Sequence, residues 1–321
     1  MKHILVTGGA GFIGSSLCER LLKDPTVKIT CIDNFDPFYS ESFKRQNLKE
    51  LEKNPRFKLV EQDITELSDL QVWLPDDYDA IVHLASKAGV RPSIQYPAQY
   101  QQVNVIGTQN LLDFARIKGI KQFVFGSSSS VYGINPNVPW QESEKLMPIS
   151  PYASTKLSGE MIGHAYTHLY GIRFIALRFF TVYGPRQRPD LAIHKFTRDI
   201  FQGDPITVYG DGSSSRDYTY VDDIVQGVLA AIDYSSSNFE IINLGNRQAV
   251  KLQEMIGTIE KACGRKAIID RRPEQPGDVP QTYADISKAG RLLNYHPATG
   301  FEEGIRKFVN WFDANQDWLL L

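Results

Sequence analysis

Tyr152 and Lys156 lie four residues apart at the start of a stretch with helical periodicity. Residues at positions i and i+4 of a helix share one face, so we expect the phenol and the amine to be neighbours. A tyrosine with a pKa of about 10 is a poor base at neutral pH, but a cation close by favours the phenolate and lowers that pKa. Ser128 is expected to hydrogen-bond the same substrate oxygen and relay its proton. Alone, the pair favours the simpler interpretation that two side chains merely share a helix surface.

A glycine cluster near the N-terminus predicts an anion-binding turn. Lys2–Thr7 is a short apolar run typical of a buried strand, and apolar residues recur at helical spacing from Phe12 onward. Gly8, Gly11 and Gly14 lie between and within these two elements, three residues apart. A strand, a glycine turn and a helix N-terminus together direct backbone N–H groups and the helix dipole at a phosphate. On spacing alone, an ordinary glycine-rich turn remains the alternative.

An acidic residue at the end of the second predicted strand makes the site a dinucleotide site. The run Lys28–Ile32 ends in Asp33, 19 residues after Gly14. A carboxylate at this place suits the ribose hydroxyls of NAD and repels the 2′-phosphate of NADP. We therefore predict NAD, whose positive nicotinamide would join Lys156 in favouring the phenolate of Tyr152.

Strand and helix patterns alternate through the first half of the chain, which favours a parallel sheet covered on both faces. The remaining strands of this half are predicted at 57–61, 79–84, 121–125 and 173–179, and the helices at 43–53, 67–74, 98–118 and 152–170. Ligands of such sheets bind at the carboxyl ends of the strands. Polar residues do follow these strand ends, at Asp33, Asp63, Ser86 and Ser127–Ser130.

The second half is less regular, and we expect it to form a smaller lobe. Helices are predicted at 194–201, 220–233, 252–263 and 301–315, strands at 206–209 and 240–244, and Pro- and Arg-rich loops at 183–191 and 271–278. The predicted fold is α/β, a Rossmann-like doubly wound parallel sheet with an interleaved C-terminal substrate-binding lobe. Residues 1–180 would form the NAD-binding domain, with part of 218–246 returning to it, and 181–321 mainly the other lobe.

Bulk composition excludes several classes of partner. The 321 residues are 42% hydrophobic and 22% charged, with a formal net charge of −2, so no basic surface for nucleic acid or anionic membrane is expected. Apolar runs of membrane-spanning length and a signal peptide are not expected, and we predict a cytoplasmic protein. The cysteines show no metal-ligand spacing and are expected to be free thiols: Cys18, Cys31 and Cys263. Four histidines likewise show no such spacing, so no metal is predicted: His83, His164, His168 and His194.

The set TGGAGFIG, Asp33, SSSSVYG and YxxxK resembles the sugar-nucleotide branch of the extended short-chain dehydrogenase/reductase family. The resemblance runs nearly end to end, through LRFFTVYGP, SRDYTYVDDI and the QPGDV loop. It implies a tightly bound NAD that is regenerated in each turnover, a UDP-sugar substrate and a homodimer. The dimer would use the helices near 98–118 and 152–170, although burial of those helices within one subunit is the alternative. The cofactor residues it implies are Gly8, Gly11, Phe12, Ile13, Gly14, Asp33, Asn34, Asp63, Ile64, Leu84, Ala85, Ser86, Asn104, Ser127, Tyr152, Lys156 and Phe179.

The residues after the fifth strand separate the reactions of this branch. Sugar-nucleotide 4,6-dehydratases carry an Asp-Glu pair at or next to the positions of Ser129 and Ser130, and UDP-glucuronate decarboxylases carry a Glu in this segment. Ser127–Ser130 contains no carboxylate, so the stretch is similar to that of the 4-epimerases. The catalytic set implied is Tyr152, Lys156, Ser128, Ser129 and Ser130.

The substrate sugar is suggested by two loops. Hexose epimerases of the family have Asn where this chain has Thr181, whereas the 184–192 loop and the AGVRPS stretch at 88–93 are similar to those of UDP-glucuronate 4-epimerases. By this resemblance Arg188 pairs the substrate carboxylate in a forked contact, supported by Thr181 and Ser93. Arg186 is the less favoured partner, and a solvated Arg188 in an epimerase of neutral UDP-hexoses is the alternative.

The nucleotide half of the substrate needs further partners. Arg216 matches the pyrophosphate-binding arginine of the family, and Asp278 matches a ribose-binding carboxylate. The hexose epimerases have an arginine three residues before that Asp; here the position is Gln275, with Arg271 or Arg272 as alternative phosphate contacts. Four further residues complete the implied substrate site: Gly89, Val90, Arg91 and Tyr209.

Overall fold

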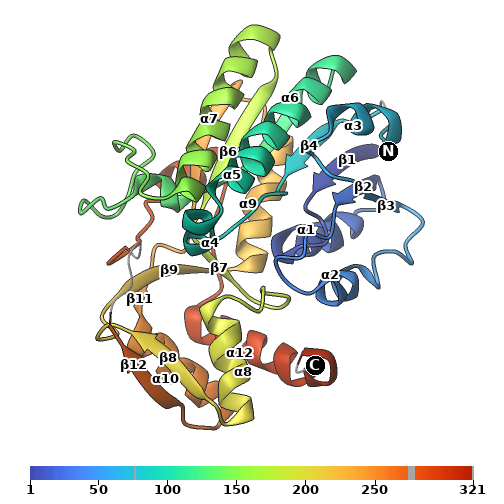
Figure 1. Cartoon of the computed structure of the whole chain (residues 1–321). Helices are drawn as coiled ribbons and strands as arrows, with labels where there is room; N and C mark the ends of the chain where they lie inside the picture. The colour runs from blue at the N-terminus through green and yellow to red at the C-terminus, as the bar shows by residue number, and fades with distance from the viewer. Residues whose placement is uncertain (76, 274–278, 320–321) are drawn as a thin grey trace.

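The computed structural model describes residues 1–75, 77–273 and 279–319 of the chain. Its centre is a parallel sheet of seven strands in the order β10-β6-β5-β4-β1-β2-β3 (Figure 1). The strands are β1 (Lys2–Thr7), β2 (Val27–Asp33), β3 (Phe57–Glu61), β4 (Ala80–His83), β5 (Gln122–Ser128), β6 (Arg173–Phe179) and β10 (Phe239–Leu244). The expected fold class is therefore confirmed, with β10 of the second half pairing in parallel with β6.

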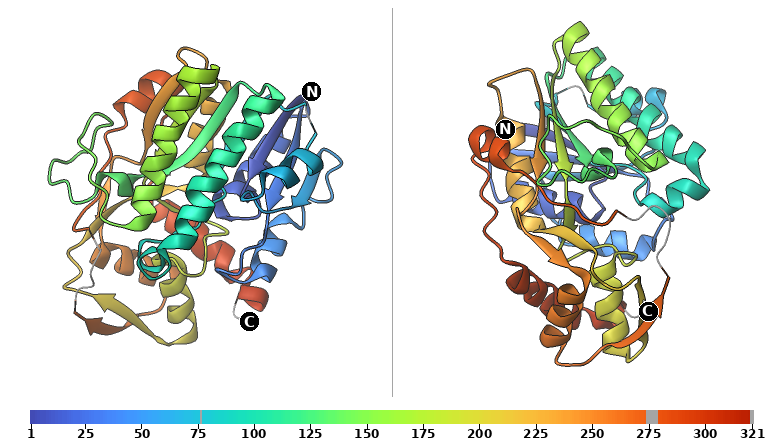
Figure 2. Two further views of the ribbon diagram at one scale, coloured as in Figure 1. Left: turned by 45° about the horizontal axis from the view of Figure 1, so that its top comes forward. Right: turned by 90° about the vertical axis from the view of Figure 1, so that its left-hand side faces the viewer.

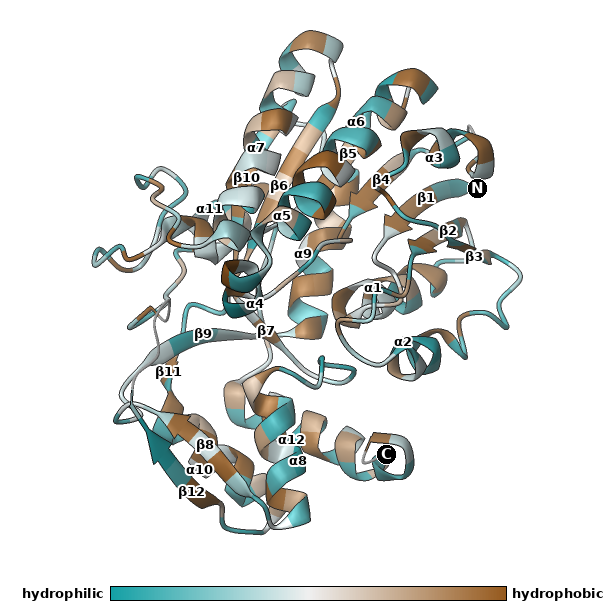
Figure 3. Cartoon of the chain, in the orientation of Figure 1, coloured by the Kyte–Doolittle hydropathy of each residue, from teal (hydrophilic) through white to brown (hydrophobic). Residues whose placement is uncertain are grey.

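These segments form strands because both of their faces can be buried. In β1, Leu5 packs in one hydrophobic cluster while Ile4 and Val6 pack in the other, and β6 divides Ala176 and Leu177 in the same way. Such two-sided burial gives continuous apolar runs and is typical of parallel sheets with helices on both faces. The apolar residues accordingly gather in the strands of the sheet (Figure 3).

Helices cover both faces of the sheet, as Figure 2 shows from the side. One layer holds α1 (Phe12–Leu22) and α9 (Val221–Asp233), which pack on each other, with α2 (Glu41–Leu48) beside α1. The opposite layer holds α3 (Leu67–Trp73), α6 (Gly107–Lys118) and α7 (Pro151–Tyr170). Shorter segments lead into α6, namely α4 (Val90–Gln95), α5 (Pro97–Tyr100) and a π-helical turn (Gln101–Ile106).

The second half adds two small sheets below the carboxyl ends of the large sheet (Figure 1). One has the order β11-β9-β7 and the other pairs β12 with β8. Their strands are β7 (Thr181–Tyr183), β8 (Pro205–Tyr209), β9 (Ser215–Tyr220), β11 (Ala249–Lys251) and β12 (Ile268–Arg272). The helices of this part are α8 (Ala192–Gln202), α10 (Leu252–Cys263), α11 (Ser287–Leu293), α12 (Phe301–Asp313) and α13 (Gln316–Leu319).

Several sequence predictions were wrong in detail. Arg271 and Arg272 were placed in a loop but end strand β12, which pairs with β8 through Arg271↔Val208 and Arg272↔Tyr209. The single helix predicted at 98–118 is divided by the π-helical turn, and Val90–Gln95 forms α4, a helix that was not predicted. Strands β7, β9 and β11 were not predicted, because each pairs with a segment distant in the sequence.

Within the described residues, no helix is both long enough and apolar enough to cross a membrane. The three cysteines are free, as predicted, with Cys18 and Cys31 buried and Cys263 half-buried.

Candidate active site

The glycine turn after β1 has no room for side chains. Gly8 has a φ of +71°, which L-residues with a Cβ rarely adopt. A Cβ at position 14 would lie 2.2 Å from the carbonyl oxygen of Gly8, so the first turn of α1 rests directly on the turn backbone. Gly11, Phe12 and Ile13 line a cavity at this place, and the N-terminus of α1 therefore opens into it. The geometry is that of a phosphate-binding turn.

Asp33 lies at the end of β2 beside this turn. Its Oδ2 accepts a hydrogen bond from the Ala10 N–H at 3.1 Å, and its Oδ1 accepts one from the Phe35 N–H at 2.9 Å. Burial raises the pKa of the carboxyl, while the charge of Lys44 and the two backbone hydrogen bonds act in the opposite direction. The side chain is thus held against the turn, at the edge of the cavity where a ribose would lie.

A single cavity of about 410 Å³ extends from the glycine turn to the start of α7. It is lined by most of the residues that the sequence placed at the cofactor: Gly8, Gly11, Phe12, Ile13, Gly14, Asp33, Asn34, Asp63, Ile64, Leu84, Ala85, Ser86, Ser127, Tyr152, Lys156 and Phe179. These residues come from the carboxyl ends of the six strands β1 to β6 and from neighbouring helices. The topology therefore brings them together as the strand-end rule predicts.

Asn104 was placed at the cofactor but lies behind the cavity wall. It is buried in the π-helical turn, where its Oδ1 accepts the Lys87 N–H at 2.8 Å. Its Nδ2 donates to the Lys87 carbonyl at 3.0 Å and to the Thr155 hydroxyl at 3.0 Å. Asn104 thus fixes the backbone that follows β4 against the start of α7, and it does not itself line the cavity.

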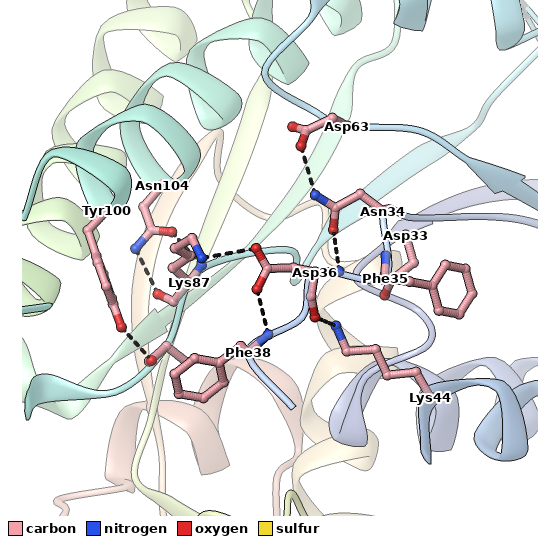
Figure 4. Close-up of polar contacts among 11 residues, drawn as sticks. Asp33, Asn34, Phe35, Asp36, Phe38, Lys44, Asp63, Lys87, Tyr100 and Asn104 are labelled. Carbon is pink, nitrogen blue, oxygen red and sulfur yellow. Dashed lines mark hydrogen bonds and ion pairs between the residues drawn. The ribbon is translucent and has the colours of Figure 1, made fainter. Parts of the chain in front are cut away.

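A strap of polar contacts lies in the cavity wall and is formed by Asn34, Asp36, Lys44, Asp63 and Lys87 (Figure 4). Lys87 Nζ donates to Asp36 Oδ2 at 2.9 Å, and the two side chains are only 19% and 28% exposed. Asn34 Nδ2 donates to Asp63 Oδ2 at 2.7 Å, and Lys44 Nζ donates to the Asp36 carbonyl at 2.7 Å. The loop after β2 is therefore tied to the segment after β4 and to α2, across the glycine turn that lies between them.

Tyr152 and Lys156 line the cavity together, but the lysine is not turned toward the phenol. Its Nζ donates to the Gly126 carbonyl at 2.8 Å and lies 6.0 Å from the centroid of the Tyr152 ring. Burial lowers the pKa of Lys156 to about 7. Burial also raises the pKa of Tyr152, while its hydrogen bond with Ser128 and the charge of Arg188 act in the opposite direction. In the protein alone the net shift is thus opposite to the lowering expected from Lys156, and Arg188 is the cation that opposes it.

The serine segment (Ser127–Ser130) lines the same cavity as Tyr152, at the carboxyl end of β5. Ser128 ends β5, and its Oγ accepts the Ser130 N–H at 3.2 Å as the cap of a 3₁₀ turn (Ser129–Tyr132). Ser127 instead donates inward to Glu160 Oε1 at 2.6 Å, beside the buried Arg178–Glu160 ion pair of 2.8 Å. Hydroxyl groups of Ser128–Ser130 therefore line the cavity, and the nearby carboxylate of Glu160 is neutralised beneath them.

Arg188 lines the cavity from the loop between β7 and α8. Its Nε donates to Asp190 Oδ1 at 2.9 Å and its Nη2 donates to Asp190 Oδ2 at 2.8 Å. The guanidinium carbon lies 5.4 Å from the centroid of the Phe38 ring. Thr181 lines the same cavity, as do Gly89 and Val90. Arg186, the less favoured alternative, forms a 2.6 Å ion pair with Glu19 of α1 instead.

A second cavity of about 180 Å³ adjoins the first. Both are lined by Val90, Ser129, Ser130 and Thr181, and the second is also lined by Arg216. The two cavities therefore meet at the serine segment.

The other residues predicted at the substrate lie around these cavities or outside the described chain. Ser93 is buried and donates to the Val90 carbonyl at 2.6 Å, without lining either cavity. The Arg91 guanidinium carbon lies 5.1 Å from the centroid of the Tyr209 ring, so these two bridge α4 and β8. Arg272 is paired with Asp270, and Arg271 donates to the Asp211 carbonyl at 3.0 Å. Gln275 and Asp278 fall outside the described residues.

Comparison with known proteins places this architecture in a family. The sequence profile of the family described as GDP-mannose 4,6 dehydratase matches residues 5–308. A UDP-glucuronate 4-epimerase of Thermodesulfobacterium geofontis is 40% identical, over 98% of this chain and 97% of its own. The chain belongs to the NAD-dependent epimerase/dehydratase family of extended short-chain dehydrogenases/reductases. The resemblance inferred from the motifs is thereby confirmed.

Solved structures of this epimerase/dehydratase family share the whole fold. UDP-glucuronic acid 4-epimerase from Bacillus cereus, in complex with UDP-glucuronic acid and NAD, is 39% identical with a TM-score of 0.89, over 98% of this chain and 99% of its own. UDP-glucose 4-epimerase from Thermotoga maritima, with UDP-glucose, is 31% identical with a TM-score of 0.90 over the same shares. Proteins with this fold therefore differ in the sugar that they bind. The fold alone does not identify the substrate, and the residues that line the cavity must be considered.

Sequence reasoning missed several residues that this member of the family places in the cavity wall. Asp36, Phe38, Tyr39 and Lys44 come from the segment 35–44, and Lys87 follows the serine of the fourth strand end. The sequence did give one signal, since 35–42 is a polar and aromatic loop directly after the NAD-specifying aspartate. Within the described residues no group of three or more His, Cys, Asp or Glu is arranged to hold a metal ion.

Proposed function

We propose that the protein is an NAD-dependent UDP-sugar 4-epimerase that interconverts UDP-glucuronate and UDP-galacturonate. The observation that carries the sugar assignment is the presence of an arginine, Arg188, in the wall of the cavity. Thr181 and Ser128–Ser130 line the same cavity, and the segment after β5 has no carboxylate to eliminate water. A cation and hydroxyl donors in one cavity suit a substrate carboxylate.

The residues of the first cavity fit NAD. The turn at Gly8 and Gly14 leaves space that a Cβ would fill, and the N-terminus of α1 faces it, as a pyrophosphate requires. Asp33 would accept the ribose hydroxyls, and the strap of Asp36 and Lys87 would close over the bridge between the two nucleotides. These contacts support a cofactor that stays bound between turnovers.

Bound NAD would accept the hydride from C4 of the sugar and return it to the opposite face. Tyr152 as phenolate takes the proton of the C4 hydroxyl, with Ser128 hydrogen-bonded to the phenol. The neutral C4 ketone turns over in the cavity, and Tyr152 gives the proton back when the C–H bond forms again. Atoms and charges balance within the site, so no external oxidant or reductant is consumed.

The C4 ketone of a glucuronate is a β-keto acid, which loses CO₂ when its carboxylate stands perpendicular to the carbonyl plane. We infer that Arg188 and Thr181 hold the carboxylate in a less reactive orientation. Their placement together in the cavity wall supports this role.

A second candidate is an epimerase of neutral sugars, UDP-glucose or UDP-N-acetylglucosamine. It is favoured by the Arg188–Asp190 ion pair, which compensates the charge of the arginine before any substrate arrives. A non-catalytic NAD-binding protein of the same fold is disfavoured, because Tyr152, Lys156 and Ser128 all line the cavity.

Product analysis by NMR after incubation with UDP-glucuronate, without added NAD, tests the proposal. We expect UDP-galacturonate to form, and Arg188→Ala to weaken turnover of the acid far more than that of UDP-glucose. Conversion of UDP-glucose or UDP-N-acetylglucosamine but not of the acid would establish the second candidate. Equal losses on acid and neutral sugars in the variant would reject the role given to Arg188.

We further propose that the protein is a homodimer through α6 and α7 with the π-helical turn. These elements pack side by side on one face of the molecule (Figure 2). Apolar side chains on this layer are exposed to solvent in the single chain: Ile106, Ile117, Met161 and Leu169. Light scattering of the purified protein, with Met161→Glu as the variant, measures the expected change from dimer to monomer.

A further inference from the structure

The Arg188–Asp190 pair is fork to fork. Nε and Nη2 of the guanidinium each donate to a different carboxylate oxygen, at 2.9 and 2.8 Å. A guanidinium has two edges that can meet a carboxylate in a bidentate contact, Nε with Nη2 and Nη1 with Nη2. The Nε–Nη2 edge is therefore taken by a residue two positions away in the same loop, and only the Nη1–Nη2 edge is left for the substrate.

The remaining donors of Arg188 face a different environment. Within the part of the chain that the structure describes, Nη1 donates no hydrogen bond. The guanidinium carbon lies over the ring of Phe38, 5.4 Å from its centroid. The side chain is 18% exposed and lines the cavity. A ligand can thus meet Nη1 and the second N–H of Nη2, on a guanidinium whose position is fixed from the opposite side.

The loop that carries the pair is held independently of Asp190. The backbone carbonyl of Gln187 is hydrogen-bonded to His194 Nδ1 at 2.7 Å, and the Gln187 side chain donates to the Val182 carbonyl at 3.3 Å. Arg186 anchors the same loop to Glu19 of α1. Removing the charge of Asp190 should therefore leave the loop and the direction of Arg188 largely in place.

We propose that Asp190 is a specificity residue: it occupies the Nε–Nη2 edge of Arg188, so that the substrate sugar meets the other edge of a guanidinium whose charge is already partly compensated. This inference rests on the proposed function and specifies its substrate range. A guanidinium whose charge is partly compensated by Asp190 can still bind a carboxylate. It can also donate a hydrogen bond to the hydroxyl of a neutral sugar, because no uncompensated charge is then left buried. The enzyme therefore takes both classes of UDP-sugar, with a moderate preference for the acid that Asp190 limits.

The isosteric variant Asp190→Asn tests this directly, because it removes the charge and keeps one oxygen acceptor. The values of kcat/KM for UDP-glucuronate and UDP-glucose are measured in the NAD-loaded enzyme. We expect the acid-to-neutral ratio to rise about tenfold, through a lower KM for the acid, because an anion next to a bound carboxylate disfavours it by Coulomb repulsion. UDP-glucose should change less than about twofold, and Asp190→Glu should restore the wild-type ratio.

Asp270→Asn is the matched control, since Asp270 pairs with Arg272 at the same sequence separation on β12, outside both cavities. It should leave the acid-to-neutral ratio unchanged. A ratio that is also unchanged in Asp190→Asn overturns the proposal, because Asp190 then has no influence on charge recognition. A ratio that falls overturns it too, because Asp190 then serves the acid by placing Arg188 and does not limit the preference.

The proposed function can fail separately. If the wild-type enzyme converts neutral sugars only, the glucuronate assignment is wrong. Equilibrium binding of UDP-glucuronate and UDP-glucose to the NAD-loaded wild type and Asp190→Asn still decides the inference, which predicts the same rise in relative affinity for the acid.

Discussion

The two ends of the long cavity are built from different parts of the chain. At the cofactor end the glycine turn and the carboxyl ends of β1, β2 and β4 bring main chain into the wall. At the substrate end it is side chains carried by loops, which are held by pairs such as Arg188–Asp190 and Arg186–Glu19. The first end therefore needs positions without a Cβ, so that a ligand can approach the backbone. The second end needs particular side chains to be held by their ion-pair partners. Substitutions should therefore act differently at the two ends.

The largest effect is expected for Gly14→Ala, which tests the backbone-built end. The new Cβ would lie 2.2 Å from the Gly8 carbonyl and 2.8 Å from the Gly9 Cα, and neither backbone atom can move aside. We expect the protein to be purified without NAD and to lose at least about 100-fold in affinity, with a stability loss of about 3 kcal/mol. Cofactor content by absorbance after denaturation and the melting temperature measure both effects.

Gly257→Ala is the control for that substitution. Gly257 lies in α10 with no atom within 4 Å of the added Cβ, so the change should stabilise the protein by about 0.5–1 kcal/mol and leave NAD bound. Full cofactor content in Gly14→Ala would contradict the assignment of the glycine turn to the pyrophosphate.

Tyr152→Phe separates chemistry from binding where the two ends meet. We expect kcat to fall about 10²–10⁴-fold, since only the proton-transferring oxygen is lost, while NAD and substrate remain bound. Tyr170→Phe, on the exposed last turn of α7, should retain wild-type turnover. Unaltered activity in Tyr152→Phe would contradict the catalytic role of Tyr152 and would favour a non-catalytic NAD-binding protein of the same fold.

Asp36→Asn asks whether side chains also matter at the cofactor end. It breaks the ion pair of the strap with Lys87 but keeps the shape, and we expect NAD to dissociate about three- to fivefold faster. Displacement by a fluorescent NAD analogue measures the rate. Glu50→Gln, in the exposed pair with Lys53, should not change it. Slower release would mean that Lys87 serves the cofactor better without Asp36, and the strap would not retain NAD.

The smallest effect concerns the free energy of unfolding at acid pH. Each end of the cavity is anchored by a buried histidine. Burial lowers the pKa of His194 to about 4 and that of His83 to about 3, against about 6.5 in the unfolded chain. Both are neutral in the folded protein, so the unfolded state binds more protons below pH 6.5 and stability is lost as the pH falls. His194 should cost about 2 kcal/mol between pH 7 and pH 5.

Denaturant unfolding at pH 5 and pH 7 measures this loss. In His194→Gln the difference between the two pH values should shrink, whereas the exposed His168→Gln should keep it. An unchanged pH dependence in His194→Gln would show that the loop bearing Arg188 is not anchored by a neutral imidazole.

The large sheet and the cofactor end could be predicted from the sequence because their signals are local. Strands β3 and β6 and helix α10 have the predicted bounds, since each is an apolar or amphipathic run between breakers. The glycine spacing and the aspartate after β2 are likewise read along the chain, and the strand-end rule then brings them together.

The substrate end could not be predicted in the same way, because its geometry depends on distant partners. Strand β7 forms only where Thr181 meets Tyr218, and β12 only where Arg271 meets Val208. The orientation of Lys156 is likewise set by the Gly126 carbonyl, which no spacing rule reveals. Nor does a sequence show whether the bidentate hydrogen bonds of Arg188 are made to a ligand or to Asp190.

One feature of the topology governs how the protein can be made. Strand β10 completes the large sheet but is synthesised only after β7, β8, β9 and α9. Until Leu244 has left the ribosome, the apolar strand β6 is an open edge, a template for pairing with other nascent chains. A fragment that stops after β6 should therefore precipitate when expressed alone, and a premature stop codon would be more harmful here than one after β10.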